Sequence, residues 1–278
     1  MEFSSRLFVT SFMKKYLLFV VFIFTLISQA KAADTVAVEN AVKVTKSPSN
    51  RVVLLELYTS EGCSSCPPAD RFLSSLKDAG VSDKHLIPLA FHVTYWDYIG
   101  WKDRFAKKQY DERQRSLAHK NRKTTVYTPQ FILSGDDYRS YATFNEDVNK
   151  LAAEKATVDL VLTANIVSDR QGEDRLQLNL ETDISKSQVK DIGYYLLVVE
   201  NNLVSDVNDG ENNGEKLHHD YVVRQFFGPY FQSKPENQSK REQTIILQPE
   251  WKREDLSVVA FAENQLTGEI LQAVRLQY

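Results

Sequence analysis

The sequence contains only two cysteines, Cys63 and Cys66, so it lacks the second cysteine pair that a zinc ribbon needs. It also lacks an excess of basic residues, because 34 Lys and Arg stand against 37 Asp and Glu, and this balance does not indicate a nucleic-acid partner. Glycine and proline are few, at 10 and 8 of 278 residues, and 42% of the chain is hydrophobic, which excludes collagen-like and low-complexity classes. No segment stays apolar over the about 18 residues of a membrane span. The composition indicates a globular protein of one large or two ordinary domains.

The amino-terminal segment has the features of a secretory signal. Lys14 and Lys15 precede an apolar run over residues 16–27, and the small residues Ala30 and Ala32 form a cleavage pattern. The alternative is a membrane anchor, but the run is shorter than a membrane span. We therefore expect residues 1–32 to be a signal peptide and residues 33–50 to be a linker. The mature protein is then periplasmic or secreted, without a stable membrane span, in a compartment where a disulfide persists.

The apolar periodicity from residue 51 onward alternates between strands and helices. Strands are predicted at 52–58, 86–93 and 126–133, and helices at 69–80, 103–122 and 144–152. This order predicts an α/β layer structure for residues 51–155. Beyond residue 156 the period changes to two, as in Leu176, Leu178 and Leu180, and seven short strands are predicted. We expect residues 156–278 to form a β-rich, sandwich-like domain.

The Cys-x-x-Cys pair lies between the first strand and the first helix. Unsatisfied backbone N–H groups and the dipole at a helix amino terminus lower the pKa of a thiol. Cys63, on the turn before the helix, is therefore the expected nucleophile, and Cys66 is the expected resolving thiol. A structural disulfide and half of a metal site share the same pattern, and the surrounding strands and helix favour redox chemistry over both.

Several segments resemble the secreted thioredoxin-like family called domain of unknown function 1223. The resemblance rests on residues 55–70, 91–101, 113–114, 127–130, 210–214 and 221–224. It implies a thioredoxin-like fold in an exported bacterial protein, without an established substrate. By likeness to thioredoxins, the Thr128-Pro129 bond is expected to be cis, to face the disulfide and to offer backbone hydrogen bonds to an extended substrate. The alternative is an ordinary trans proline at a strand edge.

Four further residues are candidates for auxiliary or substrate-binding roles. Glu56 stands where thioredoxins carry a buried acid, and it is either a general base or a strand carboxylate that faces solvent or pairs with a lysine. Trp96 and Trp101 follow the second strand, at the edge where α/β folds place ligand contacts, and would form a substrate rim. His92 would tune the thiolate. The alternative is that the aromatic residues are core and His92 is a hydrogen-bonded core histidine.

The remaining polar candidates are weaker. Arg113, Gln114 and Gln130 are either polar contacts near the site or residues of helix and strand surfaces, and the surface positions are the favoured expectation. His218 and His219, with Asp209 and Glu211 nearby, are of residue types that bind metal ions and would form a loop metal site, although loop polarity explains these residues equally well.

The leading prediction is an exported thiol-disulfide oxidoreductase that uses Cys63 and Cys66 on protein or small-thiol substrates, with no cofactor and no metal. The first alternative is an envelope binding module with a permanent disulfide, which two buried sulfur atoms would favour. The second alternative is metal handling, such as copper bound by Cys63, Cys66 and His92. The catalytic role requires that the Cys63 sulfur is exposed to water.

Overall fold

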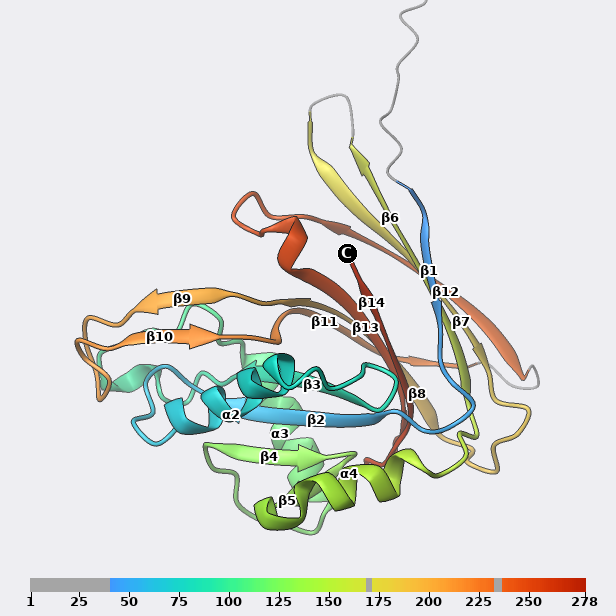
Figure 1. The fold of residues 1–278 in the computed structure, drawn as a ribbon, viewed down its shortest axis with the longest axis horizontal. Coiled ribbons are helices and arrows are strands. Elements are labelled where there is room, and N and C mark those ends of the chain that lie inside the picture. The colour runs from blue at the N-terminus through green and yellow to red at the C-terminus, as the bar shows by residue number, and fades with distance from the viewer. Residues whose placement is uncertain (1–40, 169–171, 233–236) are drawn as a thin grey trace, which may run out of the picture. The chain divides into compact units, whose positions relative to one another are not determined.

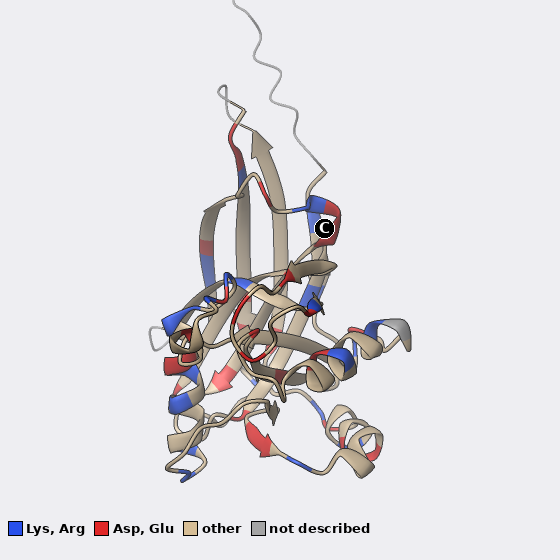
Figure 2. Ribbon diagram, turned by 90° about the vertical axis from the view of Figure 1, so that its left-hand side faces the viewer, with Lys and Arg blue, Asp and Glu red and all other residues tan. Residues whose placement is uncertain are grey.

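The computed structural model describes residues 41–168, 172–232 and 237–278. The predicted signal peptide at 1–32 and the first part of the predicted linker lie outside these residues. Strands make up 43% of the structure and helices 18%. In the described part of the chain, no helix combines the length and the apolar character that crossing a bilayer requires. Figure 2 shows Lys and Arg interspersed with Asp and Glu over the strands and helices.

The amino-terminal half alternates strands with helices, as its periodicity predicts. Its first elements are β1 (Lys43–Lys46), β2 (Val53–Thr59), α2 (Pro67–Asp78), β3 (Leu86–His92) and the 3-10 helix η1 (Asp97–Ile99). They are followed by α3 (Lys108–Lys120), β4 (Gln130–Leu133), β5 (Asp136–Tyr138), the 3-10 helix η2 (Tyr141–Thr143) and α4 (Phe144–Ala152). The predicted helix at 103–122 is shorter at both ends than expected.

The carboxy-terminal half consists mainly of strands, which the period of two predicted. They are β6 (Asp159–Ser168), β7 (Asp174–Asp183), β8 (Ile192–Glu200), β9 (Leu203–Asp206), β10 (Lys216–His219), β11 (Val222–Phe231), β12 (Gln238–Ile246), β13 (Leu256–Asn264) and β14 (Ile270–Gln277), with the 3-10 helix η3 (Arg253–Asp255) before β13. Residues 43–46 were expected in a linker, but as β1 they pair antiparallel with β6.

One sheet of eight strands draws on both halves of the chain, in the order β14-β13-β8-β11-β3-β2-β4-β5 (Figure 1). β2 and β3 are parallel, while β11 joins β3 in parallel at Val222 and Ala90 and pairs antiparallel with β8. The predicted fold class, an α/β thioredoxin-like domain at 51–155 followed by a β-rich domain at 156–278, is therefore wrong. The observed fold is mostly β, with large multi-strand sheets, and β11 continues the sheet that begins in the other half.

Two further sheets complete the fold, in the orders β1-β6-β7-β12 and β10-β9. β8 lies between β11 and β13 in the sheet, and both of its faces are covered by other parts of the chain. Tyr195 and Leu197 pack into the core that includes residues of α2, α3 and α4, whereas Tyr194 and Leu196 pack into a second core with β6 and β7. Because successive side chains of a strand point to opposite faces, a strand that is covered on both sides is apolar throughout.

Candidate functional site

The Cys63–Cys66 disulfide closes the turn between β2 and α2. The two Cα atoms are 5.4 Å apart, a separation that suits a disulfide. Cys66 is the N-cap residue of α2, and its carbonyl accepts hydrogen bonds from the N–H groups of Ala69 and Asp70. A proline in the first helical turn, such as Pro67, has no N–H to satisfy, which suits this helix start. The predicted position of the pair at a helix amino terminus is confirmed.

Both cysteines are 0% exposed, although Ser64 and Ser65 between them are exposed. The prediction that Cys63 presents an accessible sulfur is therefore wrong for this structure. Helix position alone did not decide exposure, because other segments of the chain cover the turn.

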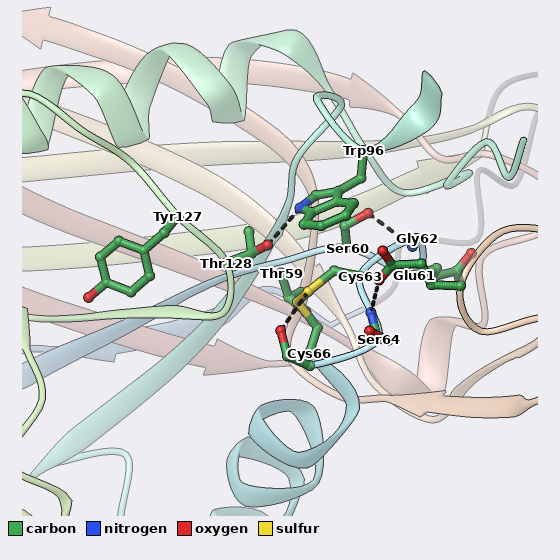
Figure 3. Close-up of a disulfide and its surroundings, with 12 residues drawn as sticks. Thr59, Ser60, Glu61, Gly62, Cys63, Ser64, Cys66, Trp96, Tyr127 and Thr128 are labelled. Atoms are coloured by element: carbon green, nitrogen blue, oxygen red, sulfur yellow. Dashed lines mark hydrogen bonds between the residues drawn. A yellow bond between two sulfur atoms is a disulfide. The ribbon is translucent and has the colours of Figure 1, made fainter. Parts of the chain in front are cut away.

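Trp96 covers the turn from the segment that follows β3. Its indole N–H donates a hydrogen bond of 2.7 Å to the hydroxyl of Thr128, and Figure 3 shows both residues beside the disulfide. A Cβ atom added to Gly62 would lie 3.2 Å from the Cβ of Trp96, so a larger residue has little room before Cys63. The predicted cis bond between Thr128 and Pro129 is confirmed. Trp96, Thr128 and Pro129 are half-buried, and their binding of a substrate stays a prediction.

A second cover comes from the connection between β9 and β10. The side-chain amide of Asn212 donates hydrogen bonds of 2.7 and 3.0 Å to the carbonyls of Glu61 and Cys63. The Ser64 N–H donates to a carboxylate oxygen of Glu211 at 3.0 Å. These contacts join the disulfide turn to a loop that lies about 150 residues later, and we did not foresee them. Residues 210–214, one of the segments that resemble the family, were the one indication of these contacts in the sequence.

A cluster of buried polar side chains adjoins this turn, and we call it the His-acid cluster. It consists of Glu61, Asp70, His92, Asp103 and His219. Nδ1 of His92 lies 2.6 Å from Oδ2 of Asp103, and the two imidazole rings meet edge to face with centroids 4.9 Å apart. Two side chains from outside the cluster donate to it: the Trp101 indole N–H bonds to Glu61 at 2.8 Å, and the Thr59 hydroxyl bonds to Asp70 at 3.0 Å.

The electrostatics of the His-acid cluster are dominated by burial and by opposite charges. Burial alone would lower the pKa of His219, but Asp70 and Glu61 outweigh it and raise the pKa to about 10. For Glu61, burial alone would raise the pKa, and its contacts, led by His219, lower it instead. For Asp103, His92 lowers the pKa against the effect of burial. The cluster therefore holds ionised carboxylates in the interior.

Four atoms of the His-acid cluster are buried without a hydrogen-bond partner: Nε2 of His92, both ring nitrogens of His219 and Oε1 of Glu61. Nε2 of His219 is 3.3 Å from Oε1 of Glu61, and Nδ1 is 3.9 Å from Oδ1 of Asp70, but neither contact has hydrogen-bond geometry. One donor atom each from Asp70, His92 and His219 lies within 4.8 Å of the others. This arrangement is able to hold a metal ion.

The loop metal site considered from the sequence is not assembled. His218, Asp209 and Glu211 are exposed, whereas His219 is buried against Asp70. His218 and His219 are neighbours on β10, and neighbouring side chains of a strand point to opposite faces. Their adjacency in the sequence was therefore misleading.

Glu56 belongs to a separate network of buried charges. The guanidinium of Arg113 donates to its two carboxylate oxygens at 2.6 and 2.7 Å and to Glu263 at 3.0 Å. Glu56 thus neither faces solvent nor pairs with a lysine, and its role as a base stays a prediction. The expected surface positions of Arg113, Gln114 and Gln130 are wrong, because all three are buried.

Comparisons with known proteins agree with this description. The family described as "protein of unknown function (DUF1223)" matches residues 54–263. No curated protein matches the chain. The crystal structure of a protein from Agrobacterium tumefaciens is similar, with a TM-score of 0.56 and 21% identity, over 83% of this chain and 96% of that one. HBP35 of Porphyromonas gingivalis is similar with a TM-score of 0.60 and 14% identity, over 83% and 76% of the two chains. At such identities the likeness shows the fold alone.

Proposed function

Since this chain belongs to the DUF1223 family, whose function is unknown, the family supplies no activity, and we propose from the geometry that the chain is an exported binding protein with a structural disulfide. The observation that carries the proposal is the burial of both cysteines, each 0% exposed. Disulfides persist in oxidising compartments and are rare in the cytosol, so the Cys63–Cys66 bond indicates an extracytoplasmic protein. A periplasmic or secreted location is part of the proposal.

Thiol-disulfide exchange requires that a thiolate approaches a sulfur atom directly. In this proposal the approach requires that the turn loses its contacts with Asn212. Each of the two hydrogen bonds contributes about 1 kcal/mol, so opening costs about 2 kcal/mol before any packing is lost. This cost keeps the exposed form at a few per cent of the molecules, which suits a structural bond better than a catalytic one.

The test is an insulin-reduction assay with the oxidised full chain and a dithiol reductant. We expect no acceleration over the reductant alone. The double variant Cys63→Ser/Cys66→Ser should unfold with about 2 kcal/mol less free energy, because a cross-link between residues three apart constrains only a short loop of the unfolded chain. Ser64→Ala, at an exposed position of the same turn, is the matched control and should leave stability unchanged. Acceleration that disappears in Cys63→Ser would overturn the proposal.

The second candidate is the thiol-disulfide oxidoreductase predicted from the sequence, and the place of Cys66 at the amino terminus of α2 favours it. In this candidate the loop that carries Asn212 first leaves the turn. The Cys63 thiolate then attacks a substrate disulfide, and Cys66 displaces the substrate from the mixed disulfide. The substrate disulfide is reduced to two thiols while the enzyme dithiol is oxidised, and a second dithiol protein or a small thiol must reduce it again. Thr128, Pro129, Trp96 and Trp101 would line the substrate.

A further inference from the structure

We infer that Asp70, His92 and His219 form a binding site for a divalent transition-metal ion of the zinc type. The inference names a ligand for the binding protein proposed above, and in this respect it rests on the proposed function. The geometry of the site does not depend on that proposal. The site would lie beside the disulfide, where α2, β3 and β10 meet. It uses neither cysteine.

His92 has the geometry of a metal-bound histidine that is oriented by an acid. Its Nδ1 lies 2.6 Å from Oδ2 of Asp103, and the same carboxylate oxygen accepts the N–H of Glu61 at 2.9 Å. If the proton of the ring resides on Nδ1, Nε2 presents a lone pair, and this atom is buried without a hydrogen-bond partner. A carboxylate that holds one ring nitrogen while the other faces a metal is the usual outer shell of metal sites.

His219 supplies the second nitrogen. β10 places its ring between two carboxylates, with Nε2 at 3.3 Å from Glu61 and Nδ1 at 3.9 Å from Asp70. Both nitrogens are buried and neither makes a hydrogen bond. Two nitrogens and one or two carboxylate oxygens form a donor set that suits zinc.

The charges of the His-acid cluster favour a cation. Glu61, Asp70 and Asp103 are three buried carboxylates, and among the ion pairs of the described residues their partners are His92 and His219. A buried charge without full compensation is costly. A divalent ion supplies two positive charges and is coordinated by neutral imidazoles.

The distances fit an ion after small rotations of the side chains. Zinc binds nitrogen and oxygen at about 2.0–2.2 Å, which separates tetrahedral ligand atoms by roughly 3.3–3.5 Å. The donor atoms of Asp70, His92 and His219 lie within 4.8 Å of one another, so the longest pair must approach by about 1.3 Å. A cavity of about 80 Å³, lined by Asp70 and His219 together with the cationic Arg71 and Lys216, borders two of the three ligands.

The experiment measures zinc binding to the untagged full chain after treatment with a chelator. We expect one equivalent of Zn²⁺ per chain by calorimetry and elemental analysis, and at least tenfold weaker binding in His219→Ala. His218→Ala is the matched control, because it removes the exposed neighbour on the same strand, and it should bind like the wild type. Cys63→Ser/Cys66→Ser should also keep the site.

Three results would overturn the inference. They are no stoichiometric Zn²⁺ on the folded wild type, unchanged binding in His219→Ala, and loss of binding only in the cysteine variant. The first would mean that His219 serves as a buried cation in an ion pair only. If His219→Ala does not fold, Co²⁺ on the wild type decides, since nitrogen and oxygen ligands give visible bands without the intense thiolate charge-transfer band. Because insulin reduction is measured on the wild type and Cys63→Ser and does not depend on zinc binding, failure of the metal site and failure of the structural-disulfide proposal are distinguishable.

Discussion

The substitution Asn212→Ala tests whether the loop between β9 and β10 seals the disulfide. The variant removes the two hydrogen bonds to the carbonyls of Glu61 and Cys63 and adds no bulk. Each bond contributes about 1 kcal/mol, so local opening of the turn becomes easier by about 2 kcal/mol. If reduction proceeds through the opened turn, the rate of disulfide reduction by a small dithiol should rise about 30-fold.

The assay follows the appearance of alkylated thiols after dithiothreitol is added to the native protein. Asn213→Ala is the matched control, because this side chain is exposed in the same loop and makes none of these bonds. Urea unfolding of both variants separates local opening from global destabilisation. A reduction rate within twofold of the wild type would refute the sealing argument, since the disulfide would then be shielded by something other than Asn212.

The same variant separates the two candidate functions. If the disulfide is structural, faster reduction lowers stability and creates no insulin-reducing activity. If the chain is an oxidoreductase under a cover, Asn212→Ala should gain activity in that assay.

Four further variants test the packing and the buried charges. Arg113→Met removes the buried cation between two carboxylates, so that Glu56 keeps the Tyr58 hydroxyl and Glu263 keeps Lys120. The variant should cost about 3–5 kcal/mol of unfolding free energy in urea, whereas a loss below about 1 kcal/mol would show that the remaining partners are sufficient. Gly135 has φ at +105°, and an added Cβ would lie 2.2 Å from a carbonyl oxygen, so Gly135→Ala should lower the unfolding free energy by more than about 2 kcal/mol. Gly80 has φ at +67° but lies in open space, so Gly80→Ala should lower it by about 1 kcal/mol. Equal losses in the two variants would contradict the clash at Gly135. Burial raises the pKa of Asp137, but hydrogen bonds from Gln130 and Tyr127 and the charge of Arg139 lower this pKa overall. The ionised carboxylate therefore stabilises the fold above about pH 4, and this stabilisation is lost as the pH falls through the lowered pKa. Asp137→Asn should therefore flatten the fall in stability below about pH 4, and an unchanged acid profile would contradict this.

Periodicity was enough to place the strands and helices near the disulfide, because each element is encoded by its own apolar spacing. It was not enough to pair the strands. β8 reads as one buried run, and only the structure shows that Tyr194 and Tyr195 face two different cores. The predicted division into two fold classes failed for this reason, since β11 joins the sheet of β3 through a contact between residues 90 and 222.

The candidate site was predicted in part. Cys63, Cys66 and the cis bond before Pro129 were identified from local patterns. The burial of the cysteines was not, because the turn contacts distant segments of the chain, such as Asn212, whose hydrogen bond to the Cys63 carbonyl spans 149 positions. Arg113 was placed on the surface because arginine is seldom buried unless it is paired, and its partner Glu56 lies 57 positions away.

The disulfide and the His-acid cluster share one residue, which makes them dependent on each other. The carbonyl of Glu61 accepts a hydrogen bond from Asn212, which holds the disulfide turn, while its side chain lies 3.3 Å from His219. Opening of the turn therefore moves a carboxylate out of the cluster. An ion held by His219, whose other ring nitrogen faces this carboxylate, opposes the opening, and by linkage the closed turn favours binding of the ion by the same factor. We accordingly expect an ion bound in the cluster to lower the equilibrium constant for reduction of the disulfide by the same factor by which reduction weakens binding of the ion.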